Sequence, residues 1–396
     1  MKVAIVQEQV DVRRGGSETS TVEMARELAC LGLDLTVVCR GAGDEPFVAD
    51  NVTYLPIPAR GLTRLGRTYR FIQGVHRLCR TQRFDIVHAV TPCLSANVYQ
   101  PRGGTYAETV TRTLARVRHP ALRYLKRLAR VFNVRQRFLQ RVEQNLLRKR
   151  RTRVSVAAVS DYVRRQVCDG LGFPGERARV IFNGVDIAPL GEDERTQQRR
   201  ALRGALGVDI GTPLVIFVAH NFGLKGLAEL VHATALAPPR RPWLVVVAGR
   251  DDPGRYRRLA RRLGVAERVR FVGTQTPVRA WLAAGEVLAH LTWYDPCSRV
   301  VLEALSVGLP VVTTRYNGAA EVMQPGRHGV VLDEPGDAPG LAAALTRALD
   351  PAVHAACRAD APRLHAQLSM SRHARELKAF YEDILAAGPS PHRAPT

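Results

Sequence analysis

Residues 291–323 read LTWYDPCSRVVLEALSVGLPVVTTRYNGAAEVM, and this stretch decides the fold of the region around it. A polar turn at 295–298 precedes an apolar run with helical spacing, 299–307, and a β-branched strand follows at 310–314. An Asn-Gly turn then opens a second helix. A helix that opens on a polar turn points free backbone N–H groups and its positive dipole end outward. The stretch therefore predicts a loop–helix–strand–loop–helix unit whose helix openings suit a phosphate.

Two carboxylates bracket the first helix of this stretch. Asp295 lies in the polar turn, and Glu303 follows eight positions later, two turns further in. Either carboxylate is able to accept hydrogen bonds from sugar hydroxyl groups. The alternative is a core helix built on Val300 and Val301, with Glu303 on its solvated face. The residues alone leave both interpretations open.

The same alternation of strands and helices runs through both halves of the chain. In the first half, strands at 2–7 and 35–39 flank a helix at 19–31. In the second half, a buried strand at 213–219 precedes a loop and a helix at 227–236. Repeated units of this kind predict an α/β chain with two doubly wound parallel sheets. Ligands of such sheets bind at the carboxyl ends of the strands.

The boundary between the two domains is expected near residue 190, where a mixed acidic and basic stretch begins. We expect a first domain at 1–190 and a second at 191–370. A helix follows at 371–386 and is expected to pack back on the first domain. The Pro-rich tail at 388–396 is expected to be disordered.

Three positions at the ends of strands or before helices are candidates for ligand binding. The pair Gly15-Gly16 precedes the first helix, and the missing side chains let a ligand approach the backbone; a plain loop is the alternative. His88 ends a strand, so it either faces a ligand or is a core histidine with a satisfied hydrogen bond. Lys225 lies in a strand-to-helix loop, where an ammonium group neutralises a phosphate.

The composition favours an anionic partner and a reducing compartment. The 396 residues carry a formal net charge of +22, and nearly all of it comes from arginine because only five lysines are present. Such a charge implies nucleic acid, anionic lipid or a phosphorylated substrate. The seven cysteines show no C-x-x-C spacing, which argues for free thiols and against a zinc site. Because the chain also lacks an Asp-x-Asp motif, we expect neither a metal ion nor a cofactor.

Residues 111–153 hold fifteen Arg or Lys residues and a single acidic residue, Glu143. Apolar residues recur through this basic segment at nearly helical spacing. Three interpretations remain open: an interfacial helix on anionic lipid, an ordinary helix that packs its apolar face inward, and a nucleic-acid surface. In the membrane interpretation the contact residues are Arg123, Lys126, Arg127 and Arg130.

Taken together, these motifs resemble glycosyltransferase family 4, whose members are retaining enzymes of the GT-B fold. The stretch at 291–323 is similar to the family signature of two carboxylates separated by seven residues. The glycine pair at 15–16, the turn at 183–186 and the loop at 225–226 accompany it, so the resemblance covers nearly the whole chain. Within the family the chain is most similar to lipopolysaccharide core heptose glucosyltransferases, which are peripheral membrane enzymes that use UDP-glucose.

The resemblance implies a role for each candidate residue. Asp295 would contact hydroxyl groups of the donor sugar, and Glu303 would accept hydrogen bonds from the ribose. Lys225 would neutralise the leaving phosphate. Gly16 would let the first domain close on this phosphate. His88 would lie near the donor sugar or the acceptor. The backbone amides that would hold the diphosphate are those of Ser298, Arg299 and Val300.

Two departures from the family pattern affect these roles. The first signature carboxylate is usually Glu, and here it is Asp295, which is one methylene shorter. Many members also carry an arginine five or six positions before the lysine, where this chain has His220 and Ala219. Arg179 and Arg250 are therefore candidates for the missing partner of the lysine.

We therefore expect a metal-independent retaining hexosyltransferase that moves a hexose, glucose by resemblance, from a nucleoside diphosphate to a lipid-anchored glycan of the cell envelope. The expected partners are UDP-glucose, the acceptor glycan and an anionic membrane surface, with no nucleic acid. The expected location is the cytoplasmic face of the cell membrane. Two alternatives remain open. One is a non-enzymatic nucleic-acid-binding protein, and the other is a GT-B sugar epimerase, for which Glu18 is the acid/base candidate in the first half.

Overall fold

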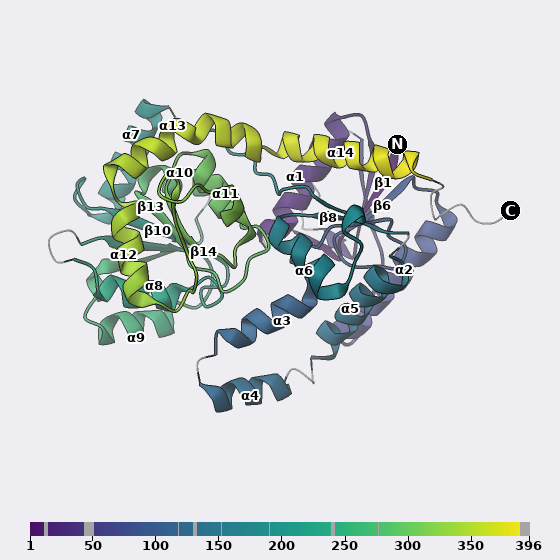
Figure 1. Ribbon diagram of the computed structural model, residues 1–396, viewed down its shortest axis with the longest axis horizontal. Helices are drawn as coiled ribbons and strands as arrows, with labels where there is room; N and C mark the ends of the chain where they lie inside the picture. Colours follow the sequence, from purple (N-terminus) through teal and green to yellow (C-terminus); the bar gives the residue numbers. More distant parts are fainter. Residues whose placement is uncertain are drawn as a thin grey trace. The chain divides into compact units, whose positions relative to one another are not determined.

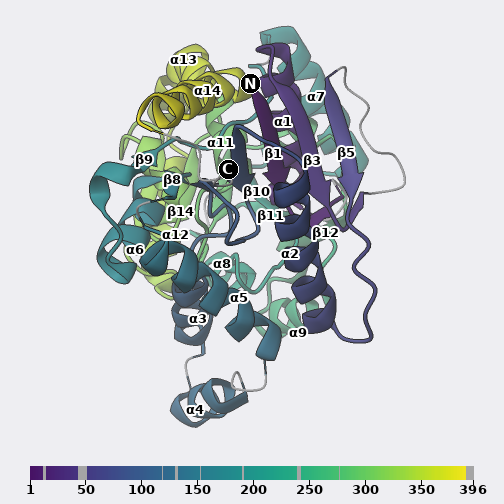
Figure 2. The same ribbon diagram turned by 90° about the vertical axis from the view of Figure 1, so that its right-hand side faces the viewer.

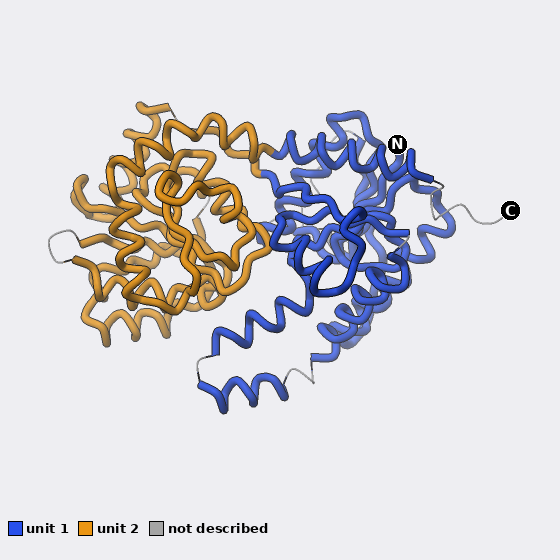
Figure 3. The backbone as a smooth tube through the Cα atoms, viewed as in Figure 1, with its two compact units in different colours: residues 1–184, 370–396 blue, residues 185–369 orange. Residues whose placement is uncertain are grey.

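The computed structural model describes residues 1–11, 15–42, 51–117, 119–129, 133–151, 153–189, 191–238, 242–275 and 277–388. It divides into two compact units, one formed by residues 1–184 and 370–396 and the other by residues 185–369 (Figure 3). The first division falls after Gly184, whereas the sequence analysis placed it after residue 190. Beyond Gly388, the tail that was expected to be disordered lies outside the described residues.

The first unit is built on a parallel sheet with the strand order β5-β3-β1-β6-β7-β8-β9. The strands that follow β1 in the chain, β3 and β5, extend the sheet toward one edge. The strands that follow β6, which are β7, β8 and β9, extend it toward the other edge. The switch point of this sheet, where α/β proteins bind ligands, therefore lies between β1 and β6. The strands are β1 (Lys2–Val6), β3 (Asp34–Cys39), β5 (Val52–Pro56), β6 (Ile86–Ala89), β7 (Val98–Tyr99), β8 (Ser155–Ala158) and β9 (Ala178–Val180).

Helices α1 (Gly16–Cys30) and α14 (Met370–Ala386) lie side by side against this sheet (Figure 1). Met24 and Leu28 of α1 share one hydrophobic core with Tyr381 of α14. Burying each of these side chains contributes roughly 1.5–3 kcal/mol, which explains why the last helix returns to the first unit. The other helices of the unit are α2 (Arg64–Thr81), α3 (Tyr106–Ala115), α4 (Pro120–Ala129), α5 (Val134–Gln144) and α6 (Asp161–Leu171).

The second unit is built on another parallel sheet, with the strand order β12-β11-β10-β13-β14-β15. Its switch point lies between β10 and β13, which are direct neighbours. The strands are β10 (Leu214–Val218), β11 (Leu244–Ala248), β12 (Val269–Gly273), β13 (Val287–His290), β14 (Val311–Thr314) and β15 (Gly329–Leu332). The helices are α7 (Glu192–Leu206), α8 (Leu227–Ala235), α9 (Gly254–Arg262), α10 (Val278–Ala284), α11 (Arg299–Ser306), α12 (Ala338–Ala348) and α13 (Pro351–Leu368).

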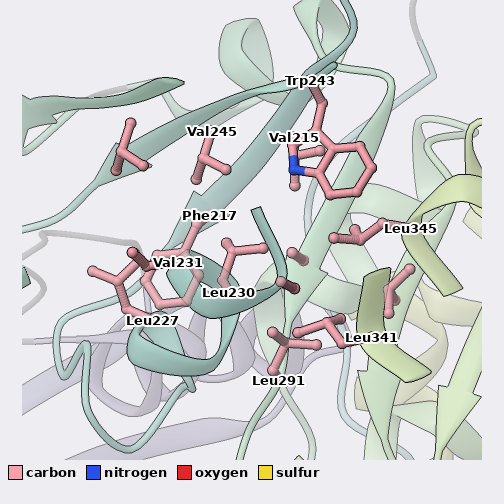
Figure 4. Close-up of a cluster of buried hydrophobic side chains, with 14 of the residues drawn as sticks. Val215, Phe217, Leu227, Leu230, Val231, Trp243, Val245, Leu291, Leu341 and Leu345 are labelled. Carbon is pink, nitrogen blue, oxygen red and sulfur yellow. The ribbon is translucent and has the colours of Figure 1, made fainter. Parts of the chain in front are cut away.

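The core of the second unit joins its sheet to α8 and α12 (Figure 4). Phe217 of β10 and Val245 of β11 pack with Leu230 of α8 and Leu345 of α12, and all four are at most 1% exposed. The near-continuous apolar runs of the strands follow from this burial, because parallel strands covered by helices leave no polar face. The sequence prediction of two doubly wound parallel sheets is confirmed.

Glu143, the acidic residue of the basic segment, is fully buried in α5 of the first unit. Its Oε1 accepts a hydrogen bond from Tyr99 Oη at 2.8 Å, and its Oε2 accepts one from the Tyr106 N–H at 3.0 Å. Burial raises the pKa of Glu143 from 4.5 to about 7, although both hydrogen bonds act to lower it. One carboxyl group thus ties β7, α3 and α5 together.

Glu143→Gln is expected to remove a pH dependence of stability. Because the folded-state pKa is raised, the stabilisation from this group is fully present below about pH 4.5 and is lost as the pH rises through about 7. Between these values the free energy of unfolding of the wild type should fall by about 3 kcal/mol more than that of the variant. Urea denaturation followed by circular dichroism at both pH values measures this difference. The same pH dependence in both proteins would contradict the assignment.

Candidate functional site

The switch point of the second unit brings together two loops that the sequence analysis singled out. Lys225 lies in the loop after β10, and Asp295 lies in the loop after β13. Because these two strands are neighbours and parallel, their carboxyl ends meet at one edge of the sheet. The fold therefore places both residues where α/β sheets bind their ligands.

Lys225 and Asp295 form a close ion pair. The distance from Lys225 Nζ to Asp295 Oδ2 is 2.5 Å, and the two side chains are only 17% and 14% exposed. The ammonium group also lies 3.4 Å from Thr292 Oγ1 and 3.3 Å from the carbonyl oxygen of Tyr294. Three oxygen acceptors thus hold the cation at the end of β13. This is a charge-assisted contact in a largely desolvated position.

His290 completes the cluster from the last position of β13. Its Nε2 lies 3.3 Å from Asp295 Oδ2 and 3.1 Å from Ser298 Oγ. Burial would raise the pKa of Asp295, but the Lys225 ammonium and the His290 contact outweigh burial and hold this pKa well below its ordinary range. Burial lowers the pKa of His290 in spite of the carboxylate. Near neutral pH, Asp295 is therefore ionised and His290 is uncharged.

Backbone hydrogen bonds fix the loop that carries Asp295. The Asp295 N–H donates to Tyr316 O at 2.9 Å, and Gly318 N–H donates to Asp295 O at 3.0 Å. The side chain of Asn317 accepts from the Ser298 N–H at 3.2 Å. The Ser298 amide, predicted to hold a diphosphate, already donates to a side chain that is 1% exposed.

Helix α11 begins directly after this loop, with Ser298 at its N-cap. Arg299 and Val300 are therefore its first two residues, where backbone N–H groups have no acceptor within the helix. The Arg299 guanidinium binds Glu303 Oε1 through Nη2 at 3.0 Å and Nε at 3.2 Å. Both side chains are 14% exposed, so Glu303 is not on a fully solvated face. The pair holds its carboxylate one turn below the helix opening.

Gly226 brings the two loops into contact. Its φ of +77° lies in the left-handed region, and a Cβ built there would lie 2.3 Å from Leu291 O. The neighbouring strand end approaches so closely that Trp293 N–H donates to Leu224 O at 2.9 Å. A side chain at residue 226 would force the lysine loop away from Asp295.

The two arginines that were candidate partners of the lysine differ in their surroundings. Arg179 belongs to the first unit, where it pairs with Asp383 at 2.8 Å and stacks over Phe380. Arg250 lies at the end of β11 in the second unit, close enough to His220 that, after burial, it is the second cause of the lowered pKa of that histidine. Arg250 therefore stands beside the position where the family usually carries its arginine.

A pocket of about 250 Å³ opens at the same edge of the second sheet. Arg250 lines it together with Phe222, which follows β10, and with Phe271 and Gly273 of β12. Aromatic side chains beside a cation suit a flat, electron-rich ring. The site thus extends sideways from the ion pair toward β12.

The remaining predicted residues lie in the first unit. Gly15 and Gly16 are the N-cap and first residue of α1, and they follow β1 at the switch point of their own sheet. His88 is fully buried, and its Nδ1 contacts Tyr381 Oη at 2.6 Å. Burial and then Arg102 lower the pKa of His88 to about 3. The geometry thus favours the core histidine that the sequence left open as an alternative.

Helix α4 carries Arg123, Lys126 and Arg127 and lies beside α3 (Figure 2). None of its described side chains is buried. Arg130 lies outside the described residues. Four large apolar side chains of this helix are instead exposed: Leu122 by 54%, Tyr124 by 63%, Leu125 by 58% and Leu128 by 46%. For α4 this observation argues against the interpretation in which the segment packs its apolar face inward, whereas Leu139 and Val142 of α5, in the same segment, are buried.

His290, Thr292 and Asn317 belong to the site, and the sequence analysis did not identify them. His290 had a usable signal, since it ends a strand next to the switch point. Asn317 was read as a turn residue, and its hydrogen bonds across the loop are visible only in three dimensions.

No described helix has the length and apolar character needed to cross a bilayer. Nor do His, Cys, Asp and Glu side chains gather there in groups of three or more that suit a metal ion.

Comparison with known proteins places these features in context. A family model described as "Glycosyltransferase Family 4" matches residues 14–188, and one described as "Glycosyl transferases group 1" matches residues 212–351. The lipopolysaccharide glucosyltransferase WaaG of Escherichia coli is 30% identical over 176 residues, which are 44% of this chain and 47% of WaaG. D-inositol 3-phosphate glycosyltransferase 2 of Catenulispora acidiphila is 28% identical over 363 residues, 82% of this chain and 80% of that protein. The match to WaaG thus spans about half of its length.

Solved structures match over nearly the whole chain. The crystal structure of WaaG gives a TM-score of 0.75 at 21% identity and covers 98% of this chain and 100% of WaaG. Anabaena HepE, solved in complex with UDP-glucose, gives a TM-score of 0.73 at 19% identity and covers 97% of this chain and 100% of HepE. At these identities the matches establish the fold, which is the expected GT-B arrangement of two Rossmann-like domains.

Proposed function

Because the chain belongs to glycosyltransferase family 4, we propose that it moves a hexose from a nucleoside diphosphate sugar to a lipid-linked glycan, with retention at the anomeric carbon. The observation that carries the proposal is the ion pair of Lys225 and Asp295 at the switch point, beside the opening of α11. UDP-glucose is the donor we favour, because the relative WaaG is named a glucosyltransferase and HepE was solved with UDP-glucose.

The donor is bound along the edge of the second sheet. Asp295 accepts hydrogen bonds from sugar hydroxyl groups, and Lys225 beside it neutralises the diphosphate. Since the Ser298 amide donates to Asn317, the diphosphate is left to the amides of Arg299 and Val300. Glu303 accepts from the ribose, and the pocket beside Arg250 receives the base. The phosphate role predicted for Gly15 and Gly16 stays a prediction; the two residues lie at the start of α1 in the first unit, and Gly16 is exposed.

The reaction exchanges one bond at the anomeric carbon for another. The bond from this carbon to the β-phosphate oxygen breaks, and the acceptor oxygen bonds to the same face of the sugar. The acceptor proton passes to the departing phosphate oxygen, so no protein base is required. Asp295 is suited to holding the sugar rather than to removing a proton, because its pKa is held low by Lys225 and His290 against the effect of burial. Lys225 stabilises the charge that develops on the leaving diphosphate.

Glu303→Gln is expected to weaken UDP-glucose binding by roughly 10-fold or more, because a hydrogen bond to a charged acceptor is lost. Isothermal titration calorimetry measures the dissociation constant. Glu267→Gln is a matched control in the same unit, since Glu267 also pairs with an arginine but is 90% exposed. If the two variants bind UDP-glucose as tightly as the wild type, Glu303 has no role at the ribose.

The lipid-linked acceptor implies attachment to a membrane surface, for which α4 is the contact. Leu122, Leu125 and Leu128 recur three residues apart on α4 and stay exposed. The cations of Arg123 and Lys126 lie toward the other side of the helix axis. A helix with exposed apolar side chains and basic residues lies in the interface of an anionic bilayer. Nucleic acid would leave the leucines in water, so this surface favours lipid.

Reversing the charges of Arg123, Lys126 and Arg127 to Glu is expected to abolish flotation with anionic liposomes. Each cation near such a surface contributes about 1 kcal/mol, and the reversal turns attraction into repulsion. The matched control reverses the exposed cations Arg258, Arg261 and Arg262 of α9, which changes the net charge equally. Docking through α4 would be refuted if both variants lost flotation with anionic liposomes equally. It would also be refuted if the wild type floated equally well with neutral and with anionic liposomes.

A further inference from the structure

His290, the last residue of β13, has a buried ring that none of the roles above uses. Its Nε2 atom faces two groups of the loop that follows, Asp295 Oδ2 at 3.3 Å and Ser298 Oγ at 3.1 Å. We propose that His290 is a positioning residue that holds the Asp295 carboxylate in the orientation that binds the donor sugar. It would thereby contribute to the affinity for the sugar and not to the affinity for the nucleotide. This inference rests on the proposed transfer reaction.

The contacts of the ring decide which of its two nitrogens carries the proton. An ionised carboxylate accepts hydrogen bonds and donates none, so the contact with Asp295 requires a hydrogen on Nε2. The other nitrogen, Nδ1, is buried and has no hydrogen-bond partner among the described residues, so a proton placed there would be left unpaired. Burial lowers the pKa of His290, and the neutral ring holds a single proton. Nε2–H is therefore the tautomer that this site favours.

The side-chain donors around Asp295 converge on one of its two carboxylate oxygens. Oδ2 accepts from the Lys225 ammonium group at 2.5 Å and from the His290 ring at 3.3 Å. Oδ1 accepts from the backbone N–H of Cys297 at 3.3 Å. Each oxygen of an ionised carboxylate has two lone pairs, so Oδ1 keeps one beyond this backbone bond. Oδ2 is therefore the anchored oxygen, and Oδ1 is the oxygen suited to a sugar hydroxyl group.

His290 and Lys225 anchor this oxygen in different ways. The ammonium group of Lys225 also contacts Thr292 Oγ1 and the carbonyl oxygen of Tyr294, and it is the cation proposed to meet the diphosphate. The ring of His290 is only 2% exposed, and its backbone carbonyl accepts a hydrogen bond from Thr313 Oγ1 of the neighbouring strand at 2.8 Å. Because this buried ring has no room to follow a ligand, its hydrogen bond keeps Oδ2 in place when the donor binds.

The place of this contact limits what His290 is able to affect. The ring touches the carboxylate that would hold the sugar, whereas Glu303 and the first N–H groups of α11 are the groups proposed for the ribose and the diphosphate. Without the ring donor, the Asp295 side chain would be free to rotate, and its hydrogen bonds to sugar hydroxyl groups would weaken. Binding of UDP alone would not change. A purely structural role would instead change the two affinities equally.

Isothermal titration calorimetry of the full chain with UDP-glucose and with UDP tests the proposal. His290→Leu removes the donor, and it should weaken UDP-glucose binding about fivefold or more while UDP binding stays as in the wild type. His290→Gln places an amide N–H near the position of Nε2 and should restore the affinity for UDP-glucose. His328→Leu is the matched control, because His328 is fully buried and its Nε2 contacts Asp360 Oδ2 at 2.8 Å. His328 lies at the amino end of β14, away from the donor loops, so this variant should bind both ligands as the wild type does.

The proposal is overturned if His290→Leu weakens the binding of UDP and UDP-glucose equally or changes neither, or if His290→Gln binds UDP-glucose no better than His290→Leu. Should His290→Leu not fold, His290→Asn takes its place, since its amide is too short to reach Asp295.

A second measurement needs no ligand. Long-range ¹H–¹⁵N NMR of protein labelled at histidine reports the tautomer of each ring, and the signal of His290 is the one that His290→Gln lacks. We expect the Nε2–H form. If the wild type binds UDP-glucose and the ring carries its proton on Nδ1, the positioning role fails alone. If the wild type binds no nucleotide sugar, the transfer reaction fails and the positioning role fails with it.

Discussion

Lys225→Ala is expected to lower turnover by roughly 10²- to 10³-fold, with a smaller effect on the affinity for the donor. The ammonium group is the cation at the switch point of the second sheet, and it would meet charge that develops only as the diphosphate departs. A group that acts mainly in the transition state changes kcat more than KM. Release of UDP from UDP-glucose, measured with a coupled assay, gives both constants.

This variant needs a control for stability, because it leaves the carboxylate of Asp295 buried without its partner. Breaking such a pair costs roughly 3–5 kcal/mol. The double variant Lys225→Met, Asp295→Asn removes both charges and should recover most of the stability while it stays inactive. Turnover near the wild-type level in either protein would remove the lysine from the mechanism.

Asp295→Asn is the second substitution with a large expected effect, again roughly 10²-fold or more on turnover. The amide keeps the size of the side chain and the hydrogen bond from the Cys297 N–H, which is 3.3 Å in the wild type. It loses the charge that pairs with Lys225 and orients His290. Asp295→Glu is the matched variant, since it keeps the charge and restores the longer residue that the family usually carries. We expect Asp295→Glu to change the ratio of turnover between UDP-glucose and UDP-galactose.

The acid stability of the same variants checks the ion pair without any substrate. Lys225 and His290 outweigh burial and hold the pKa of Asp295 below its ordinary value of 3.8. A depressed pKa stabilises the fold above the unfolded value, and this contribution is lost as the pH falls below about 4. The stability gap between wild type and Asp295→Asn should therefore narrow on acidification. A gap that stays constant from neutral pH to about pH 3 would contradict the geometry.

Much of the fold was predictable because its signals are local. Short β-branched runs alternate with helical spacing, and this pattern alone indicates parallel sheets covered by helices. The positions of Lys225 and Asp295 followed from the same pattern, since both residues lie in loops after buried strands. What the pattern could not supply was the strand order that makes β10 and β13 neighbours. Their direct ion pair therefore emerged only from the structure.

The parts that escaped prediction depend on contacts between distant residues. The buried His88 forms its hydrogen bond with Tyr381, which lies 293 positions away. The hydrogen bond from the Ser298 N–H to the Asn317 side chain joins the loop after β13 to the loop after β14, which are far apart in the local sequence pattern. The sequence analysis identified Glu143 only as the single acidic residue of a basic segment, and the structure shows a buried carboxyl group that links β7, α3 and α5. In each case the sequence shows the residue but not its partner.

The measurement that tests the central claim most directly is the thermal unfolding midpoint of the full chain with a panel of nucleotide sugars. Hexose 1-phosphates and free nucleosides are the matched controls. At least one nucleotide sugar should raise the midpoint in proportion to the logarithm of its concentration, and Glu303→Gln should reduce the shift. If no nucleotide sugar raises the midpoint, or hexose 1-phosphates raise it equally, the second unit is not a nucleotide-sugar site.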